Sequence, residues 1–196
     1  MSRQLRRVCV YCASSRKADP AYLNAADSLG RLLARHGITV VYGGGSVGAM
    51  GALANGALAE GGRVIGVLPR FMYDLEWGHR GLTELRLVND LHERKRLMIE
   101  EVDAIVALPG GSGTLEELLE AITWKRLGLY VNPIVLVNIR GFFDALVALF
   151  DRAIAEHFMD MRHRSMWSVV EQIEEVLRAI HEAPEWSPEA RKFATV

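Results

Sequence analysis

The sequence has little of what marks membrane, secreted or nucleic-acid-binding proteins. No apolar run reaches the length of a membrane span, about 20 residues. The formal net charge of −1 gives no general attraction to nucleic acid or to an anionic membrane. The N-terminus is basic up to Arg7, but the pattern of a signal peptide does not follow it. We therefore expect a cytoplasmic protein without nucleic-acid or membrane partners.

Cysteine is also scarce, with only Cys9 and Cys12 in 196 residues. Their C-x-x-C spacing is typical of redox motifs at helix N-termini. Here both lie inside a strand-like run, in which residues i and i+3 face opposite sides. A metal site would need more ligands. We therefore expect two reduced, largely buried thiols and no metal.

Apolar strand-like runs alternate with helical patterns along the whole chain. This alternation predicts an α/β fold with a Rossmann-like, doubly wound parallel sheet in a three-layer αβα arrangement. We expect residues 1–196 to form a single domain, with a flexible tail after about residue 184. The predicted strands are residues 8–13, 39–42, 63–68, 85–88, 104–108, 133–138 and 166–169. The predicted helices are residues 20–36, 47–60, 91–101, 115–127, 142–156 and 170–181.

The segment Pro109-Gly-Gly-Ser-Gly-Thr-Leu-Glu-Glu117 joins a buried strand to a helix. In open α/β sheets, ligands and anions bind where a strand ends and the next helix begins. Its three glycines allow close backbone approach and positive φ angles. Glutamates beside an anion site repel the anion, so their presence here suggests that they take part in a reaction. The loop therefore suggests catalysis as well as anion binding.

A second glycine loop follows the second predicted strand, with Gly43, Gly45 and Gly48 in G-x-G-x-x-G spacing. This context favours a phosphate or nucleotide, although glycines for tight helix–strand packing remain an alternative. A dinucleotide site would also have a carboxylate at the end of the next strand, and none is present there. Ser14, after the first strand, could bond a phosphate or ribose, or simply cap the turn.

Arg94 and Lys95 lie near the start of a predicted helix. Charge runs on helices are usually solvated, but cations at a helix amino terminus oppose its dipole unless an anion compensates. With both glycine loops at the same sheet edge, these cations and Glu117 suit cleavage of an N-glycosidic bond, whose oxocarbenium-like transition state a carboxylate stabilises. The lysine loop of phosphoryl-transfer enzymes, G-x-x-x-x-G-K-[ST], is absent.

These motifs resemble the LONELY GUY family of cytokinin-activating phosphoribohydrolases, once labelled lysine decarboxylase-like. The family pattern P-G-G-x-G-T-x-x-E matches residues 109–117, its R-K pair matches Arg94 and Lys95, and Thr123-Trp124 also fits; Leu91 departs from the usual Met. The resemblance implies a homodimer that hydrolyses cytokinin riboside 5′-monophosphates, and AMP, to free base and ribose 5-phosphate without a cofactor.

The resemblance also implies roles for individual residues. Arg94 and Glu117 would be the catalytic pair. The substrate-binding residues would be Ser14, Gly44, Gly45, Glu76, Lys95, Gly111, Ser112, Gly113, Thr114, Leu115, Glu116 and Thr123. For Glu76 the alternative is an exposed loop carboxylate, for Thr123 a hydroxyl that bonds its own turn, and for Glu116 an ordinary helix-start carboxylate.

Other functions and the base pocket stay open at this stage. A non-catalytic nucleotide-binding or molybdenum-cofactor carrier protein, or an AMP sensor, would share the fold and the glycine loop. A pyridoxal decarboxylase would need a Schiff-base lysine, and the few lysines lack that setting. Residues 71–83 could be a lid or a surface loop. Met98 and the aromatic residues of 71–77 are candidates for the walls of a base pocket.

Overall fold

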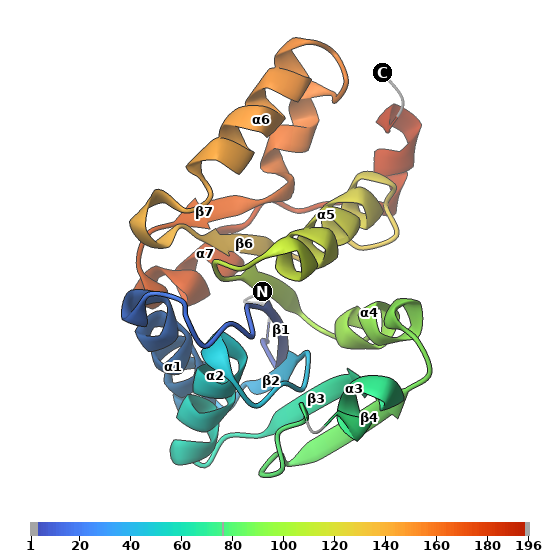
Figure 1. The fold of residues 1–196 in the computed structure, drawn as a ribbon. Coiled ribbons are helices and arrows are strands. Elements are labelled where there is room, and N and C mark those ends of the chain that lie inside the picture. The colour runs from blue at the N-terminus through green and yellow to red at the C-terminus, as the bar shows by residue number, and fades with distance from the viewer. Residues whose placement is uncertain (1–3, 76, 195–196) are drawn as a thin grey trace.

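A single parallel sheet of seven strands forms the centre of the protein in the computed structural model, which describes residues 4–75 and 77–194. The strand order is β4-β3-β2-β1-β5-β6-β7, and each strand runs parallel to its neighbours (Figure 1). The strands are β1 (Arg7–Tyr11), β2 (Thr39–Tyr42), β3 (Val64–Pro69), β4 (Glu84–Val88), β5 (Ala104–Ala107), β6 (Ile134–Val137) and β7 (Ser168–Val170). The predicted parallel α/β sheet is confirmed.

Helices cover both faces of this sheet, as the doubly wound prediction requires. One core packs α1, α2 and α7 on the sheet, and the other packs α4, α5 and α6 on the opposite face. The α-helices are α1 (Pro20–Arg35), α2 (Gly48–Ala59), α3 (Arg70–Asp74), α4 (Leu91–Ile99), α5 (Ser112–Arg126), α6 (Asp144–Ala155) and α7 (Val176–Glu182). Short 3₁₀ segments are η1 (Ile139–Gly141), η2 (Met161–Met166), η3 (Ile173–Glu175) and η4 (Pro188–Phe193).

Strand β1 shows how the two cores are separated. Val8 and Val10 belong to one core, whereas Cys9 and Tyr11 belong to the other, because successive side chains of a strand point to opposite faces. Cys12 lies in the core opposite Cys9, and both thiols are free and buried. The predicted pair of reduced thiols on opposite faces is therefore confirmed.

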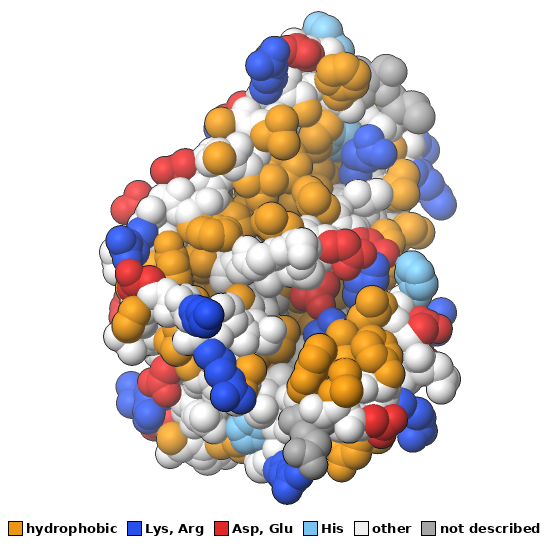
Figure 2. Space-filling model, in the orientation of Figure 1, with side chains coloured by type: hydrophobic (Ala, Val, Ile, Leu, Met, Phe, Trp, Pro, Cys, Tyr) orange, Lys and Arg blue, Asp and Glu red, His pale blue; other side chains and the backbone are white. Residues whose placement is uncertain are grey.

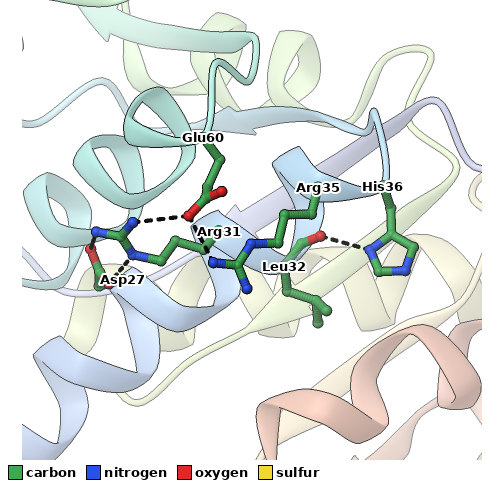
Figure 3. Close-up of polar contacts among 6 residues, drawn as sticks. All are labelled: Asp27, Arg31, Leu32, Arg35, His36 and Glu60. Carbon is green, nitrogen blue, oxygen red and sulfur yellow. Dashed lines mark hydrogen bonds and ion pairs between the residues drawn. The ribbon is translucent and has the colours of Figure 1, made fainter.

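Helices α1 and α2 lie side by side and their backbones approach closely (Figure 1). An added Cβ at Gly30 would lie 2.1 Å from the Leu53 carbonyl oxygen, and one at Gly56 would lie 2.3 Å from the carbonyl of Asp27. At the far end, Glu60 accepts from Arg31 at 3.0 Å and from Arg35 at 2.8 Å (Figure 3). Because these ion pairs are solvated, the close backbone packing contributes more to stability than they do.

The ends of some elements differ from the predictions. Helix α5 begins at Ser112 rather than residue 115, so Gly113 and Thr114 lie in its first turn and Gly111 is its N-cap. None of Gly110, Gly111 and Gly113 has a positive φ, so the loop does not use the conformational freedom that these glycines allow. The last helix begins at Val176, because residue 170 pairs with β6 as the end of β7.

The sheet order places a topological switch point between β1 and β5. The chain moves outward from β1 through β2 and β3 to β4, then returns to the other side of β1 as β5. In such sheets the loops after the two central strands diverge and leave a crevice for ligands. The two glycine loops follow β2 and β5, so both lie beside this crevice.

The chain after α7 lies outside the central sheet. Beyond α7 the chain returns to α5, where the Trp186 indole nitrogen donates to the Lys125 carbonyl at 2.7 Å. The prediction of a flexible tail concerns motion and stays a prediction. Among the described residues, no helix is long and apolar enough to cross a membrane.

The close contact between α1 and α2 generates a test of stability. We expect Gly30→Ala to lower the free energy of unfolding by about 1–3 kcal/mol, because the methyl group must push two packed helices apart. Urea denaturation measures the change. Ser28→Ala, at an exposed position of the same helix, is the matched control and should change the stability little. Equal effects of the two substitutions would contradict the packing argument.

Candidate active site

The guanidinium of Arg94 is fixed by contacts with three different elements. Asp90 is the N-cap of helix α4, and its carboxylate accepts from the His92 and Glu93 amides at 2.8 Å each. One turn later, the Arg94 side chain donates to the Val67 carbonyl at 3.1 Å and to the Gly43 carbonyl at 3.3 Å. These two bonds tie α4 to β3 and to the residue that directly follows β2. Arg94 is only 8% exposed, so its charge is held in a fixed place below the surface.

The third contact of Arg94 is an ion pair with Glu117. Arg94 Nη1 lies 3.1 Å from Glu117 Oε1. Glu117 is on the second turn of α5 and is only 5% exposed. The structure therefore brings the predicted catalytic pair together from two helices that lie on the same face of the sheet.

Gly43 is what allows Arg94 to reach this position. A Cβ added to Gly43 would lie 2.0 Å from Arg94 Nη2, inside the guanidinium. A larger residue here would displace the cation from the Gly43 carbonyl and from Glu117. The first glycine of the second loop thus serves the ion pair directly.

The charge state of Glu117 is shifted by its surroundings. Burial raises its pKa most, and the neighbouring carboxylates Glu116 and Glu120 raise it further. Arg94 and Lys95 act in the opposite direction, and the resulting pKa is about 7. The carboxyl can therefore exist in either form near neutral pH, which suits a group that takes up and returns a proton.

Lys95 pairs with two other glutamates of α5 and not with Glu117. Its ammonium contacts Glu116 and lies 3.1 Å from Glu120 Oε2. Burial lowers the pKa of Lys95, but its hydrogen bonds to these two carboxylates outweigh the burial and raise it. This pairing resolves why two cations lie near the start of α4, because α5 supplies the anions.

A cavity of about 610 Å³ opens at the carboxyl edge of the sheet, above the ion pair. Figure 2 shows its mouth as the hollow in the middle of the face, with acidic and basic side chains at its rim. Its lining comes from the ends of β1, β2 and β3 and from the start of α5. The predicted residues that line it are Ser14, Gly45, Arg94, Gly111, Ser112, Gly113, Thr114 and Glu117.

Other predicted substrate contacts do not line this cavity. Gly44, Lys95, Leu115, Glu116 and Thr123 are not among its lining residues. The Gly44 carbonyl accepts from the His79 amide at 2.9 Å, and the Thr123 hydroxyl donates to Leu119 in its own helix at 2.8 Å. Glu76 lies outside the described residues. For all six, a contact with substrate stays a prediction.

The start of α5 is built to receive an anion. Gly111 is its N-cap and offers no side chain to the first-turn amides. Such amides carry the positive end of the helix dipole and seek an acceptor. Thr114 packs against Gly110, where an added Cβ would lie 2.1 Å from the Thr114 hydroxyl. The glycines at 110 and 111 therefore keep the helix end free of side chains that would block it.

Two residues predicted from the sequence also line the cavity: Gly43 of the second glycine loop, and Trp77, one of the aromatic residues of 71–77 predicted for the base pocket. Several other residues of the wall were not singled out from the sequence. They are Cys12, Ala13, Arg16, Ser46, Val47, Met50, Leu68 and Met72. Arg16 could have been found, since it follows shortly after a strand. Met72 could not, because short helix α3 lacks a periodic pattern. Among the described residues, no group of His, Cys, Asp and Glu side chains could hold a metal ion.

The raised pKa of Glu117 generates a prediction about stability and pH. The pKa of Glu117 is about 7 in the folded protein, whereas the ordinary value of 4.5 applies to the unfolded chain. The folded protein therefore keeps its full stability below pH 4.5 and loses part of it as the pH rises from 4.5 to 7. Glu117→Gln removes the titration. We expect the variant's stability relative to wild type to rise by up to about 3 kcal/mol across this window.

Urea denaturation at several pH values measures this difference. Glu100→Gln, at an exposed position, is the control and should follow the wild-type profile. If the difference between Glu117→Gln and wild type is constant from pH 4.5 to 7, Glu117 has no raised pKa.

Comparison with known proteins identifies the family. The family described as "Possible lysine decarboxylase" matches residues 50–180. The chain is 46% identical over 157 residues to a cytokinin riboside 5′-monophosphate phosphoribohydrolase of Oryza sativa subsp. japonica, covering 80% of this chain and 64% of that protein. It is 41% identical over 180 residues to one of Arabidopsis thaliana, covering 91% of this chain and 82% of the relative.

A solved structure shares the fold. The molybdenum cofactor carrier protein of Chlamydomonas reinhardtii superposes with a TM-score of 0.69 at 22% identity, covering 90% of this chain and 96% of the other. At that identity the likeness concerns the fold alone. The family match and the two plant relatives, together with the buried arginine–glutamate pair, show that this chain belongs to the LONELY GUY family of phosphoribohydrolases.

Proposed function

We propose that this protein hydrolyses the N-glycosidic bond of nucleoside 5′-monophosphates, namely cytokinin riboside 5′-monophosphates and AMP. The products are the free base and ribose 5-phosphate. The observation that carries the proposal is the buried pair of Arg94 and Glu117, 3.1 Å apart, in the wall of a cavity that also contains the start of α5. The relatives' names support this reaction.

The phosphate would bind at the end of the cavity formed by β1 and α5. The first-turn amides of α5, with Gly111 to Thr114, offer donors and the positive end of a helix dipole. Ser14 and Arg16 line the same end, and the Arg16 side chain has no ion-pair partner among the described residues. Since the Arg94 side chain is occupied by Glu117 and by two backbone carbonyls, Arg16 and the helix end are the groups left free to contact the phosphate.

Glu117 would act on the ribose carbon that bears the base. As the bond from C1′ to the base nitrogen breaks, positive charge develops on the ribose, and a carboxylate beside it stabilises that state. Glu117 also takes the proton from a water molecule whose oxygen bonds to C1′. Glu117 then gives this proton to the departing base, whose nitrogen has lost its bond to C1′. Arg94 fixes the orientation of the carboxylate throughout.

The proposal extends to a homodimer. The exposed large apolar side chains include Leu119 on α5 and Leu149 on α6. Figure 2 shows hydrophobic side chains gathered over α5 and α6. An apolar area of this kind is typical of a surface buried by another chain. We also propose a cytoplasmic location, because free thiols at Cys9 and Cys12 suit a reducing compartment.

The reaction is tested by incubating the purified protein with AMP and with isopentenyladenosine monophosphate. We expect free base and ribose 5-phosphate in equal amounts, detected by chromatography. Glu117→Gln should lower kcat by about a hundredfold or more while nucleotide affinity stays nearly unchanged, because only the transition state carries the charge that the carboxylate stabilises. Arg94→Ala should impair both binding and rate.

Two outcomes would contradict the proposal. If wild type releases base from neither substrate while still binding AMP, the protein is a nucleotide binder and not a hydrolase. If Glu117→Gln turns over normally, the carboxylate is structural. Glu100→Gln, at an exposed position on α4's C-cap, is the matched control and should retain wild-type kcat.

The homodimer is tested by light scattering after gel filtration. We expect twice the chain mass of 21.8 kDa. The double variant Leu119→Asp with Leu149→Asp should shift the equilibrium toward the monomer, because it would place charges in a desolvated interface. Leu75→Asp, at an exposed apolar position after α3, is the control and should remain dimeric. A wild-type monomer at micromolar concentration would refute this part of the proposal.

A further inference from the structure

The cavity changes from polar to apolar along the edge of the sheet. At the end formed by β1 and α5, its lining includes Ser14, Ser15 and Thr114. At the end formed by β3 and α3, the lining is Leu68, Met72 and Trp77. The strand order puts β2 and β1 between β3 and β5, so these two ends lie on opposite sides of the cavity. Arg94 and Glu117 lie between them, because Arg94 contacts β2 and β3 on one side and α5 on the other.

This gradient orients a nucleoside monophosphate. A phosphate at the polar end places the ribose near the ion pair, and the base then extends toward β3. The groups that meet the far side of the base are therefore the apolar ones. Met50, which reaches Gly43 and Gly45, extends this apolar wall from α2.

Trp77 is the largest and most accessible member of the wall. It is 53% exposed although it lines the cavity, so a ligand has indole surface left to cover. Its backbone is held firmly, since its carbonyl accepts from the Ser46 amide at 3.1 Å and from the Ser46 hydroxyl at 3.2 Å. A bridge between Gly45 and Gly78 secures the next residue. These main-chain contacts fix the position of the Trp77 backbone. They do not involve the indole ring.

Other candidates for a base pocket are excluded by their positions. Met98 is fully buried in the core between α4 and the sheet. Phe71 and Tyr73 are exposed on α3, and neither lines the cavity. Met72 lies between them in the sequence but does line it.

We propose that Trp77 and Met72 bind an apolar substituent on the exocyclic nitrogen of the adenine base and so determine a preference for N6-alkylated nucleotides over AMP. The proposal rests on the hydrolase function proposed above. Large apolar surface at the mouth of a polar site is costly to leave in water, and an alkyl group covers it. Unsubstituted AMP lacks the atoms that would reach this wall.

The test compares kcat/KM for isopentenyladenosine monophosphate with kcat/KM for AMP, using the full chain. We expect wild type to prefer the alkylated substrate. Trp77→Ala should reduce that preference by about tenfold or more, with kcat/KM for AMP nearly unchanged, since an apolar contact of one or more carbon atoms discriminates by tens-fold. Trp77→Phe should keep most of the preference, because it retains a flat apolar ring.

Phe71→Ala is the matched control, since it removes an equally exposed aromatic ring from the same segment without touching the cavity. It should leave the preference unchanged. Should Trp77→Ala fail to fold, Met72→Ala provides the same comparison, with the same expected loss.

Two results would overturn the inference: a wild type without preference, or a Trp77→Ala preference equal to that of wild type, which includes equal losses for both substrates. In each of these the hydrolysis of AMP by wild type stands, so the proposed reaction survives. If wild type hydrolyses neither nucleotide, the proposed function itself is wrong and the preference falls with it.

Discussion

The arginine–glutamate pair of Arg94 and Glu117 is the interaction on which the arrangement of the cavity depends. Burying two charges is costly unless their mutual attraction and further hydrogen bonds compensate. Two backbone carbonyls compensate part of this cost, that of Val67 in β3 and that of Gly43, which directly follows the adjacent strand β2. The pair therefore joins β2, β3, α4 and α5 at one point. A glycine at position 43 follows from the same requirement, because any side chain there would occupy the place of the guanidinium.

A second ion pair beside the first sets the charge balance of the site. Lys95 pairs with both Glu116 and Glu120, and of these three carboxylates of α5 Glu117 is the one that lines the cavity. Its burial favours the neutral form, whereas Arg94 favours the charged one. A carboxyl whose pKa is near 7 under these opposing influences can change its charge when a ligand brings a phosphate or excludes water. The three neighbouring ion pairs thus act together on the pKa of Glu117.

Much of the fold followed from the sequence because its signals are local. Strand-like runs alternating with helical patterns placed the elements, and the glycine motifs placed both loops at the carboxyl edge of the sheet. That Arg94 and Glu117 share one site was also predictable, since both stand in family motifs; their catalytic role stays a prediction. Position 170 was misassigned because pairing with β6 overrode a helical pattern. The pairing of Lys95 with Glu116 could not be predicted, because it depends on how α4 and α5 pack.

The proposed position of the phosphate rests on ion pairs that the sequence alone could not supply. The sequence places Arg94 and Lys95 as two cations near a helix start, which suggests an anionic ligand for both. In the structure, both are paired with glutamates of α5. In the proposed function, the phosphate therefore binds to other groups, namely Arg16 and the uncapped start of α5, which also line the cavity. By the strand order, the end formed by β1 and α5 is the one away from Trp77. The ion pairs around Glu117 thus support the proposed orientation, with the phosphate away from β3 and the base toward it.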